Sequence, residues 1–277
     1  MDSTPPTSHP PQRVAIAGLG TIGRHIAQAI DRDMPGLRLT AVAARNQDAA
    51  RAWATSSLTH PVEVVALEEL AAHADIVLES APASLLTTLA EPVLRAGKTV
   101  VVLSSGALLD QWHLVELARA HGGQIIVPTG ALLGLDAVTA AAEGTIHSVR
   151  MVSRKPVAGF RGAPYLVRNN IDIDGITEPK CLFKGAAREA AAGFPANLNV
   201  AISLSLAGIG PDRTELEIWA DPTITRNTHS ITVDADSASF TMTIENIPTD
   251  NPKTGRITAL SVIALLRKLH APLRVGT

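Results

Sequence analysis

The sequence predicts an α/β protein with a Rossmann-type, doubly wound parallel sheet and a second α+β domain with a mixed, largely antiparallel sheet. Three observations predict this fold class. Short apolar runs alternate with helix-like segments through the first half of the chain, and a glycine-rich turn directly follows the first run. From Thr145 onward, strand-like alternation of apolar and polar residues becomes dominant.

Six short apolar runs in the first half have the length of buried strands. In order, they are residues 13–18, 37–44, 63–66, 75–78, 99–103 and 124–127. Between them, helical spacing of apolar residues predicts helices at 24–30, 46–53, 82–96 and 109–120. Parallel strands need crossover connections, so this order predicts a parallel sheet with helices on both faces.

The second half begins with a helix-like segment, after which strand-like alternation of apolar and polar residues becomes dominant. We expect helices at 131–143, 184–192, 196–207 and 256–270, and strands at 145–153, 214–220, 230–234 and 239–244. This pattern predicts a flexible tail (1–12), a dinucleotide-binding domain (13–130) and a substrate and dimerisation domain (131–252). We expect the final helix, within 253–271, to return to the first domain.

The glycine-rich turn is the first chemical signal. Gly18, Gly20 and Gly23, with Thr21 and Ile22 between them, form a GxGxxG motif that follows a strand and opens a helix. In that context the glycines allow a tight turn, approach of the backbone to a pyrophosphate, and close packing of helix on strand. We therefore predict that these five residues bind NAD or NADP, against the alternative of an ordinary tight turn.

The end of the second predicted strand bears on cofactor choice. An acidic residue there would bind the ribose of NAD, but the strand ends in Ala44, Arg45 and Asn46. Arg45 is a candidate to face the 2′-phosphate of NADP, or it is a solvated surface residue. The sequence therefore leaves NAD or NADP open.

Composition excludes several classes of protein. With 24 basic and 26 acidic residues, the formal net charge of −2 gives no reason to expect nucleic acid or an anionic membrane as a partner. Cys181 is the single cysteine, so an internal disulfide and a multi-cysteine metal site are excluded, and a reducing, cytoplasmic location is expected. The longest uncharged stretch, 190–211, is broken by Pro195 and polar residues, which favours a buried helix over a membrane span.

Several longer stretches carry a family resemblance. They include Pro128 to Ala137 (PTGALLGLDA), Arg154-Lys-Pro156, Leu182 to Pro222, Asn227 to Ile231 (NTHSI), and Glu245 to Pro248 with Asn251 to Thr254. On these stretches the sequence resembles the L-aspartate dehydrogenase family over nearly its whole length. The resemblance implies NAD(P)-dependent oxidation of L-aspartate to iminoaspartate, which hydrolyses to oxaloacetate and ammonia. It also implies a homodimer with a dihydrodipicolinate-reductase-like arrangement of domains.

The resemblance assigns roles to individual residues. His229, in NTHSI, stands where the family has its catalytic histidine. Ala131 and Asn199 stand where the family contacts the nicotinamide end of the cofactor, with Asn197 as the alternative asparagine. Gly255 departs from the family pattern, which more often has serine there.

The chemistry of the residues supports part of this assignment. A histidine with a pKa near neutrality suits the proton transfers of amine oxidation, although a structural histidine is the alternative for His229. The two substrate carboxylates need cations, and Lys155 and Lys253 are the better candidates because both lie in loops beside proline. A related dehydrogenase for another amino acid or imine, and a non-catalytic dinucleotide-binding sensor, remain as alternatives.

Overall fold

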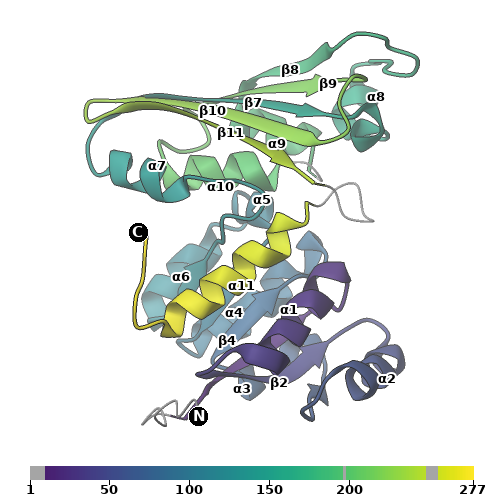
Figure 1. The fold of residues 1–277 in the computed structure, drawn as a ribbon, viewed down its shortest axis with the longest axis vertical. Helices are drawn as coiled ribbons and strands as arrows, with labels where there is room; N and C mark the ends of the chain where they lie inside the picture. Colours follow the sequence, from purple (N-terminus) through teal and green to yellow (C-terminus); the bar gives the residue numbers. More distant parts are fainter. Residues whose placement is uncertain (1–9, 196–197, 248–254) are drawn as a thin grey trace, which may run out of the picture. The chain divides into compact units, whose positions relative to one another are not determined.

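The computed structural model describes residues 10–195, 198–247 and 255–277 (Figure 1). The chain divides into two compact units. Unit 1 comprises Met1–Pro128 and Val262–Arg274, and unit 2 comprises Thr129–Ser261 and Val275–Thr277.

Unit 1 is built on a six-stranded parallel sheet in the order β3-β2-β1-β4-β5-β6. Its strands are β1 (Gln12–Ala17), β2 (Leu37–Ala43), β3 (Glu63–Val64), β4 (Ile76–Glu79), β5 (Thr99–Val102) and β6 (Gln124–Ile126). From β1 the chain builds outward to β2 and β3, then crosses back to β4 and builds the other way. Ligands of such sheets bind at the carboxyl ends of the strands beside this reversal, which here means the end of β1.

Helices connect these strands. They are α1 (Thr21–Asp33), α2 (Gln47–Ser57), α3 (Leu70–His73), α4 (Leu86–Arg95), α5 (Ser105–Leu108) and α6 (His113–His121), with 3₁₀ turns η1 (Leu67–Glu69) and η2 (Ala83–Leu85). Right-handed crossovers on the two sides of β1 place the helices on opposite faces of the sheet. The prediction of a doubly wound Rossmann-type sheet is confirmed.

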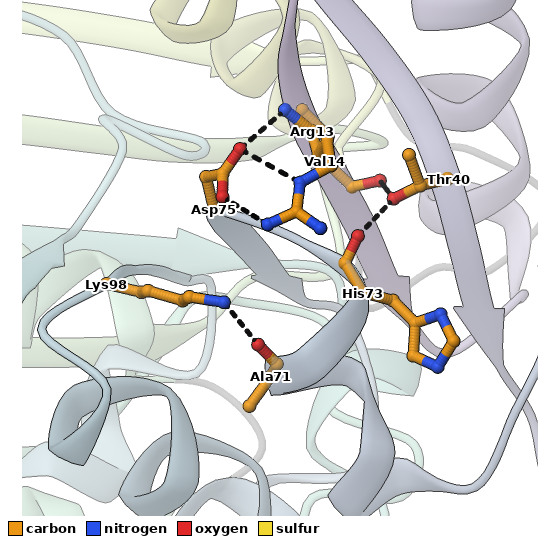
Figure 2. Close-up of polar contacts among 7 residues, drawn as sticks. All are labelled: Arg13, Val14, Thr40, Ala71, His73, Asp75 and Lys98. Carbon is orange, nitrogen blue, oxygen red and sulfur yellow. Dashed lines mark hydrogen bonds and ion pairs between the residues drawn. The ribbon is translucent and has the colours of Figure 1, made fainter.

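Polar side chains tie the strands together at their amino ends (Figure 2). Asp75, just before β4, accepts hydrogen bonds from the backbone N (3.0 Å), Nε (3.3 Å) and Nη2 (2.7 Å) of Arg13. Thr40 on β2 donates to the carbonyl of His73 (2.8 Å), and Lys98 Nζ donates to a carbonyl in α3 (2.6 Å). This cluster lies at the sheet edge opposite to the ligand-binding edge, so we assign it a structural role.

Unit 2 is built on a five-stranded mixed sheet in the order β11-β10-β7-β9-β8. Its strands are β7 (Ile146–Lys155), β8 (Lys180–Ala186), β9 (Thr214–Ala220), β10 (Asn227–Ala235) and β11 (Ser239–Asn246). Only the β7–β9 pair is parallel. The prediction of a mixed, largely antiparallel sheet is therefore confirmed.

The helices of unit 2 lie on one side of this sheet (Figure 1). They are α7 (Leu135–Ala142), α9 (Ala187–Gly193) and α10 (Asn199–Ala207), with a short helix α8 (Pro164–Arg168) and the 3₁₀ turn η3 (Val157–Phe160) at one end. On the central strands, alternate residues such as Met151, Leu216 and Ile231 are buried against these helices. The opposite face carries more exposed residues, including Arg150 and Thr232.

The last helix, α11 (Ile257–His270), continues from unit 2 into unit 1. Within unit 1, Val262 and Leu266 are fully buried. Arg267 Nη2 donates to Asp33 Oδ2 (3.2 Å), and His270 Nε2 lies 3.1 Å from Gln12 Oε1. The C-terminal part of α11 is therefore an integral part of unit 1.

The element predictions fail in a few segments. Residues 184–192 were expected to be helical, but Lys184 lies on β8, which pairs with β9, and the helix begins at Ala187. The helix expected at 109–120 begins only at His113, as α6, and the short helix α5 precedes the expected range. Residues 131–134 precede α7 in a turn, because Gly134 has a φ of +65°.

Candidate active site

The glycine turn after β1 has three different environments. Gly18 has a φ of +93°, and a Cβ there would lie 2.5 Å from the carbonyl oxygen of Ser80. A Cβ at Gly23 would overlap the carbonyl oxygen of Gly18, whereas at Gly20 nothing lies within 4 Å. Gly18 and Gly23 are therefore required for close packing, and Gly20 leaves its side of the backbone open to a ligand.

The helix that follows this turn presents a favourable end for an anion. Its N-cap is Gly20, no side chain caps it, and its first turn contains no acidic residue. The exposed Thr21 and half-buried Ile22 are its first residues. Unsatisfied N–H groups and the positive end of the helix dipole favour a phosphate here. The open glycine and this helix end fit the pyrophosphate of a dinucleotide.

Arg45 lies close to the same turn along the sheet edge. The backbone N of Gly18 donates to the carbonyl of Ala43 at the end of β2 (2.8 Å), and Arg45 follows two residues later. Asn46 caps α2 by accepting from the N of Ala49 (3.0 Å). The Arg45 side chain is exposed, and within the described residues it has no hydrogen bond or ion pair.

A buried polar cluster lies on the helix-covered face of the unit 2 sheet. His229 on β10 is directly opposite Ser153 on β7, and its Nδ1 is 3.1 Å from Ser153 Oγ. Lys155, two residues further along β7, shares the same face because side chains alternate along a strand. His229, Ser153 and Lys155 are only 2%, 5% and 5% exposed.

Burial changes the titration of both basic groups in this cluster. Loss of hydration lowers the pKa of Lys155 to about 8. Loss of hydration, with the positive charge of Lys155 as a second cause, lowers the pKa of His229 to about 3. In the ligand-free protein His229 is therefore neutral at pH 7. This low pKa differs from the near-neutral value that suits proton transfer, because burial beside a cation disfavours imidazolium.

The start of α10 lies beside the same cluster. A cavity of about 10 Å³ is lined by Ser153 and Lys155 from β7 and by Leu198 and Ala201 at the start of α10. This volume is at the lower limit for one water molecule. Asn199, an exposed residue at the first position of α10, lies between those two lining residues in the chain.

The loop that contains Ala131 is held by side chains of unit 2. Asn246 Nδ2 donates to the carbonyl oxygen of Ala131 (2.9 Å), and the N of Gly130 donates to Ser261 Oγ (3.1 Å). Gly130 and Gly134 both have positive φ values. Among the described residues, Asn246 Oδ1 is the one fully enclosed side-chain N or O atom without a hydrogen-bond partner.

Two family models match the chain. Residues 18–128 match the model described as homoserine dehydrogenase, NAD binding domain, and residues 136–269 match the one described as aspartate dehydrogenase, C-terminal. The L-aspartate dehydrogenase of Bradyrhizobium diazoefficiens is 62% identical over 96% of this chain and 94% of its own length. The chain belongs to the L-aspartate dehydrogenase family.

A second relative agrees with this membership, and two solved structures agree with the fold. L-aspartate dehydrogenase 3 of Bordetella bronchiseptica is 61% identical over 95% of this chain and 97% of its own length. The structure of aspartate dehydrogenase from Thermotoga maritima has a TM-score of 0.71 at 20% identity, and covers 96% of this chain and 99% of its own. Scyllo-inositol dehydrogenase of Lactobacillus casei, solved with NAD(H) and scyllo-inositol, has a TM-score of 0.51 at 15% identity. The match covers 93% of this chain and 87% of that protein's chain. As a family member with an NAD-binding domain, the protein is an oxidoreductase that uses a nicotinamide dinucleotide.

Unit 2 of this family member contains most of the residues expected to meet the substrate. His229 and Lys155 belong to one buried cluster, and Asn199 begins the helix beside it. Lys155 is the last residue of β7, buried, and not in a loop as expected. Asn197 and Lys253 lie outside the described residues.

Other polar residues have structural partners. Glu79 is buried and accepts from the N atoms of Leu103 (3.0 Å) and Ser104 (2.8 Å), so it holds the turn before α5. Asp221 accepts from the N of Thr223 (2.9 Å) and so forms the turn around Pro222. The single cysteine, Cys181, is exposed on β8.

The sequence interpretation missed Ser153 and Asn246. Ser153 is the last residue of the predicted strand 145–153, and it shares a face with Lys155 because β7 extends two residues further, to Lys155. Pairing with His229 depends on the register between β7 and β10, which local sequence does not specify. Asn246 is the second residue of the stretch Glu245 to Pro248, but nothing in that stretch predicts its bond to Ala131.

None of the described residues forms a group of three or more candidate metal ligands, and none of the described helices is long and apolar enough to cross a membrane.

Proposed function

We propose that the protein catalyses the reversible, NAD(P)-dependent oxidative deamination of L-aspartate. The product is iminoaspartate, which hydrolyses to oxaloacetate and ammonia. Iminoaspartate is a precursor of the pyridine ring of NAD, so a role in NAD biosynthesis is part of this proposal. The observation that carries the proposal is the buried pair of His229 and Lys155, on strands β10 and β7 of a chain from the L-aspartate dehydrogenase family.

Lys155 is proposed to bind a substrate carboxylate. An ammonium group that burial has deprived of water gains much from a carboxylate partner, because their attraction is strong where water is excluded. L-Aspartate carries two carboxylates, and Lys253 is our candidate for the second. Asn197 or Asn199 would add an amide donor or acceptor at the start of α10.

His229 is proposed to be the catalytic residue. Its Nδ1 is bonded to Ser153, so Nε2 is the nitrogen left for substrate. Hydride loss from the Cα of aspartate requires a neutral amine, and imine hydrolysis requires a polarised water. Substrate carboxylates beside Lys155 would offset its positive charge. In our proposal this raises the pKa of His229 from the ligand-free value of about 3 and lets the ring exchange protons.

The dinucleotide is proposed to bind at the turn from Gly18 to Gly23, with the pyrophosphate at the start of α1. When bound, the nicotinamide accepts the hydride. Ala131 and Asn199 would contact its nicotinamide end. The exposed Arg45 is proposed to face a 2′-phosphate, so that NADP is used alone or beside NAD.

Absorbance of the reduced nicotinamide tests the reaction directly. L-Aspartate with NAD or NADP should produce the signal, and glutamate, alanine and homoserine should not. Oxaloacetate with ammonia and reduced cofactor should reverse it. Signal with another amino acid alone would transfer the assignment to a related dehydrogenase. Cofactor binding without any turnover would favour a sensor.

A His229→Ala variant tests the catalytic assignment. We expect turnover to fall about a hundredfold or more, since positioned acid–base groups contribute ~10²–10⁴-fold. Cofactor affinity, measured by fluorescence of the reduced dinucleotide, should stay nearly constant. Wild-type turnover in this variant would refute the role of His229.

Arg45→Asp tests the cofactor assignment. A carboxylate repels the 2′-phosphate, so we expect kcat/KM for NADP to fall relative to NAD. Arg45→Gln, which removes the charge without reversing it, is the matched control and should give a smaller shift. An unchanged ratio would place Arg45 away from the ribose.

The resemblance also supports a homodimer. We propose that the second copy covers the exposed face of the unit 2 sheet, where Thr232 and Thr241 lie opposite each other on β10 and β11. The cytoplasmic location expected from the single cysteine stays a prediction.

A further inference from the structure

The neutral ring of His229 can carry its proton on either nitrogen, and its environment differs on the two sides. Nδ1 lies 3.1 Å from the hydroxyl of Ser153. Nε2 has no hydrogen-bond partner among the described residues. Asn246 Oδ1 is the one fully enclosed side-chain N or O atom without a partner among those residues, so Nε2 of His229 is at least partly accessible. Water or a ligand can therefore satisfy Nε2 as either a donor or an acceptor.

The Ser153 hydroxyl has no such freedom. Ser153 is 5% exposed, and His229 Nδ1 is the single side-chain or backbone group that its hydroxyl meets within the described residues. If Nδ1–H donated to Oγ, the hydroxyl proton would be buried without an acceptor. A buried donor without an acceptor loses its hydration without replacement. If the hydroxyl donates to Nδ1, both groups are satisfied.

We propose that Ser153 is a positioning residue that donates its hydroxyl proton to Nδ1 of His229, and so holds the ring as the tautomer with its proton on Nε2. The antiparallel register of β7 and β10, which pairs Ser153 with His229, fixes the ring orientation at the same time. Low pKa values in this cluster agree with a neutral ring in the ligand-free protein.

This tautomer determines which chemical group His229 recognises. Nε2–H is a hydrogen-bond donor, so it selects an oxygen acceptor on the ligand, such as a carboxylate or the carbonyl of a 2-oxo acid, over an ammonium group. The ring would therefore first meet aspartate or oxaloacetate through an oxygen. A hydroxyl can also accept, so Ser153 stays bonded to Nδ1–H when the ring becomes protonated.

The tautomer can be measured without any turnover. Nitrogen-15 NMR of the ligand-free, full-length protein distinguishes pyridine-type from pyrrole-type ring nitrogens, and the His229→Gln variant assigns the signals. We expect a pyridine-type Nδ1 and a pyrrole-type Nε2 for His229. A pyrrole-type Nδ1, or averaged signals from both tautomers, would overturn the proposal.

Variants at Ser153 test the consequence for activity, which rests on the proposed function. Ser153→Ala should average the two nitrogen signals, lower kcat with L-aspartate about tenfold or more and shift the pH profile of kcat, while KM for the cofactor stays unchanged. Ser153→Thr keeps the hydroxyl and should restore the tautomer and most of the activity. If Ser153→Ala is misfolded by circular dichroism, Ser153→Thr and the wild-type spectrum still decide the proposal.

The two assignments fail in different ways. An active His229→Gln variant would refute the catalytic role of His229 and leave the tautomer result standing. An unchanged kcat and pH profile in folded Ser153→Ala would refute the positioning role, even with His229 essential.

Discussion

The glycines of the turn after β1 are equivalent in the motif but not in the structure. Gly23 has the carbonyl of Gly18 where its Cβ would be, while Gly20 has open space. Gly20 also has a φ of −73°, which any residue adopts. The two positions therefore separate a packing role from a ligand-approach role.

Alanine substitutions should show this separation. Gly23→Ala should lower the free energy of unfolding by about 1–3 kcal/mol, because an overlap with backbone must be relieved by displacement. Gly20→Ala should leave stability unchanged but weaken dinucleotide binding about tenfold or more, since the added methyl blocks the pyrophosphate. Urea unfolding and cofactor titration measure the two effects. Equal stabilities of the two variants would contradict the assignment.

The burial of Lys155 links stability to pH. Its pKa is lowered from 10.5 to about 8, so between these values the unfolded chain binds a proton that the native protein does not. Stability contributed by this group therefore rises with pH from about 8 to 10.5, and the cost of burying the charge is fully present below pH 8. The pKa of His229 is lowered from 6.5 to about 3, so the stability that His229 contributes also rises with pH between about 3 and 6.5.

Lys155→Met should reveal this cost. We expect the variant to be about 1–3 kcal/mol more stable at pH 7, with a flatter stability curve above pH 8, because the thioether side chain has no charge to desolvate. Activity with L-aspartate should fall sharply. Thermal unfolding from pH 6 to 10 measures the first effect. Lower stability at pH 7 would show that the ammonium is well compensated in the native protein.

At the scale of elements, Glu79 joins β4 to the turn between β5 and α5. Its carboxylate accepts from two backbone N–H groups and from Ser104 Oγ (3.0 Å). Burial raises the pKa of Glu79, and these hydrogen bonds partly offset that rise. The bonds hold the carboxyl ends of two neighbouring strands together, at the edge where ligands of such sheets bind.

Glu79→Leu should lower the free energy of unfolding by about 1–3 kcal/mol, because two partly buried backbone N–H groups lose their acceptor. Glu79→Gln keeps one carbonyl oxygen as an acceptor and should lose less. Urea denaturation compares the pair. A Leu variant as stable as the Gln variant would show that water replaces the carboxylate.

The element order could be predicted from sequence because buried strands and amphipathic helices have different periods. The prediction failed at Lys184, where helix-favouring composition was outweighed by edge pairing of β8 with β9, opposite Glu217. His229 could be proposed as the catalytic residue from its motif. Its bond to Ser153 and the low pKa could not, since both arise from register and burial among segments far apart in the chain.

At the scale of the whole molecule, the exposed face of the unit 2 sheet is the surface that we propose a second copy covers. Thr232 lies on β10, with β7 on one side and β11 on the other, so it is away from the sheet edges. Its hydroxyl lies 3.4 Å from that of Thr241. A second copy of the chain on this face would bury both.

Thr232→Arg should convert the proposed dimer to monomers, because it places unpaired charges in the interface. Sedimentation velocity measures the change. Asp48→Arg, on the exposed first turn of α2 in unit 1, is the control and should remain dimeric. A dimeric Thr232→Arg protein would exclude this face as the interface.

The final helix gives synthesis of this protein an unusual order. Unit 1 contains the amino-terminal residues, yet it also needs Val262–Arg274, with the buried Val262 and Leu266. During translation, the strands of unit 1 can pair, but the unit still lacks the part of α11 that packs against it. The segment made first is therefore completed last, after all of β7 to β11 has emerged. A nascent chain that stalls just before α11 would leave the nucleotide-binding half exposed to chaperones and proteases.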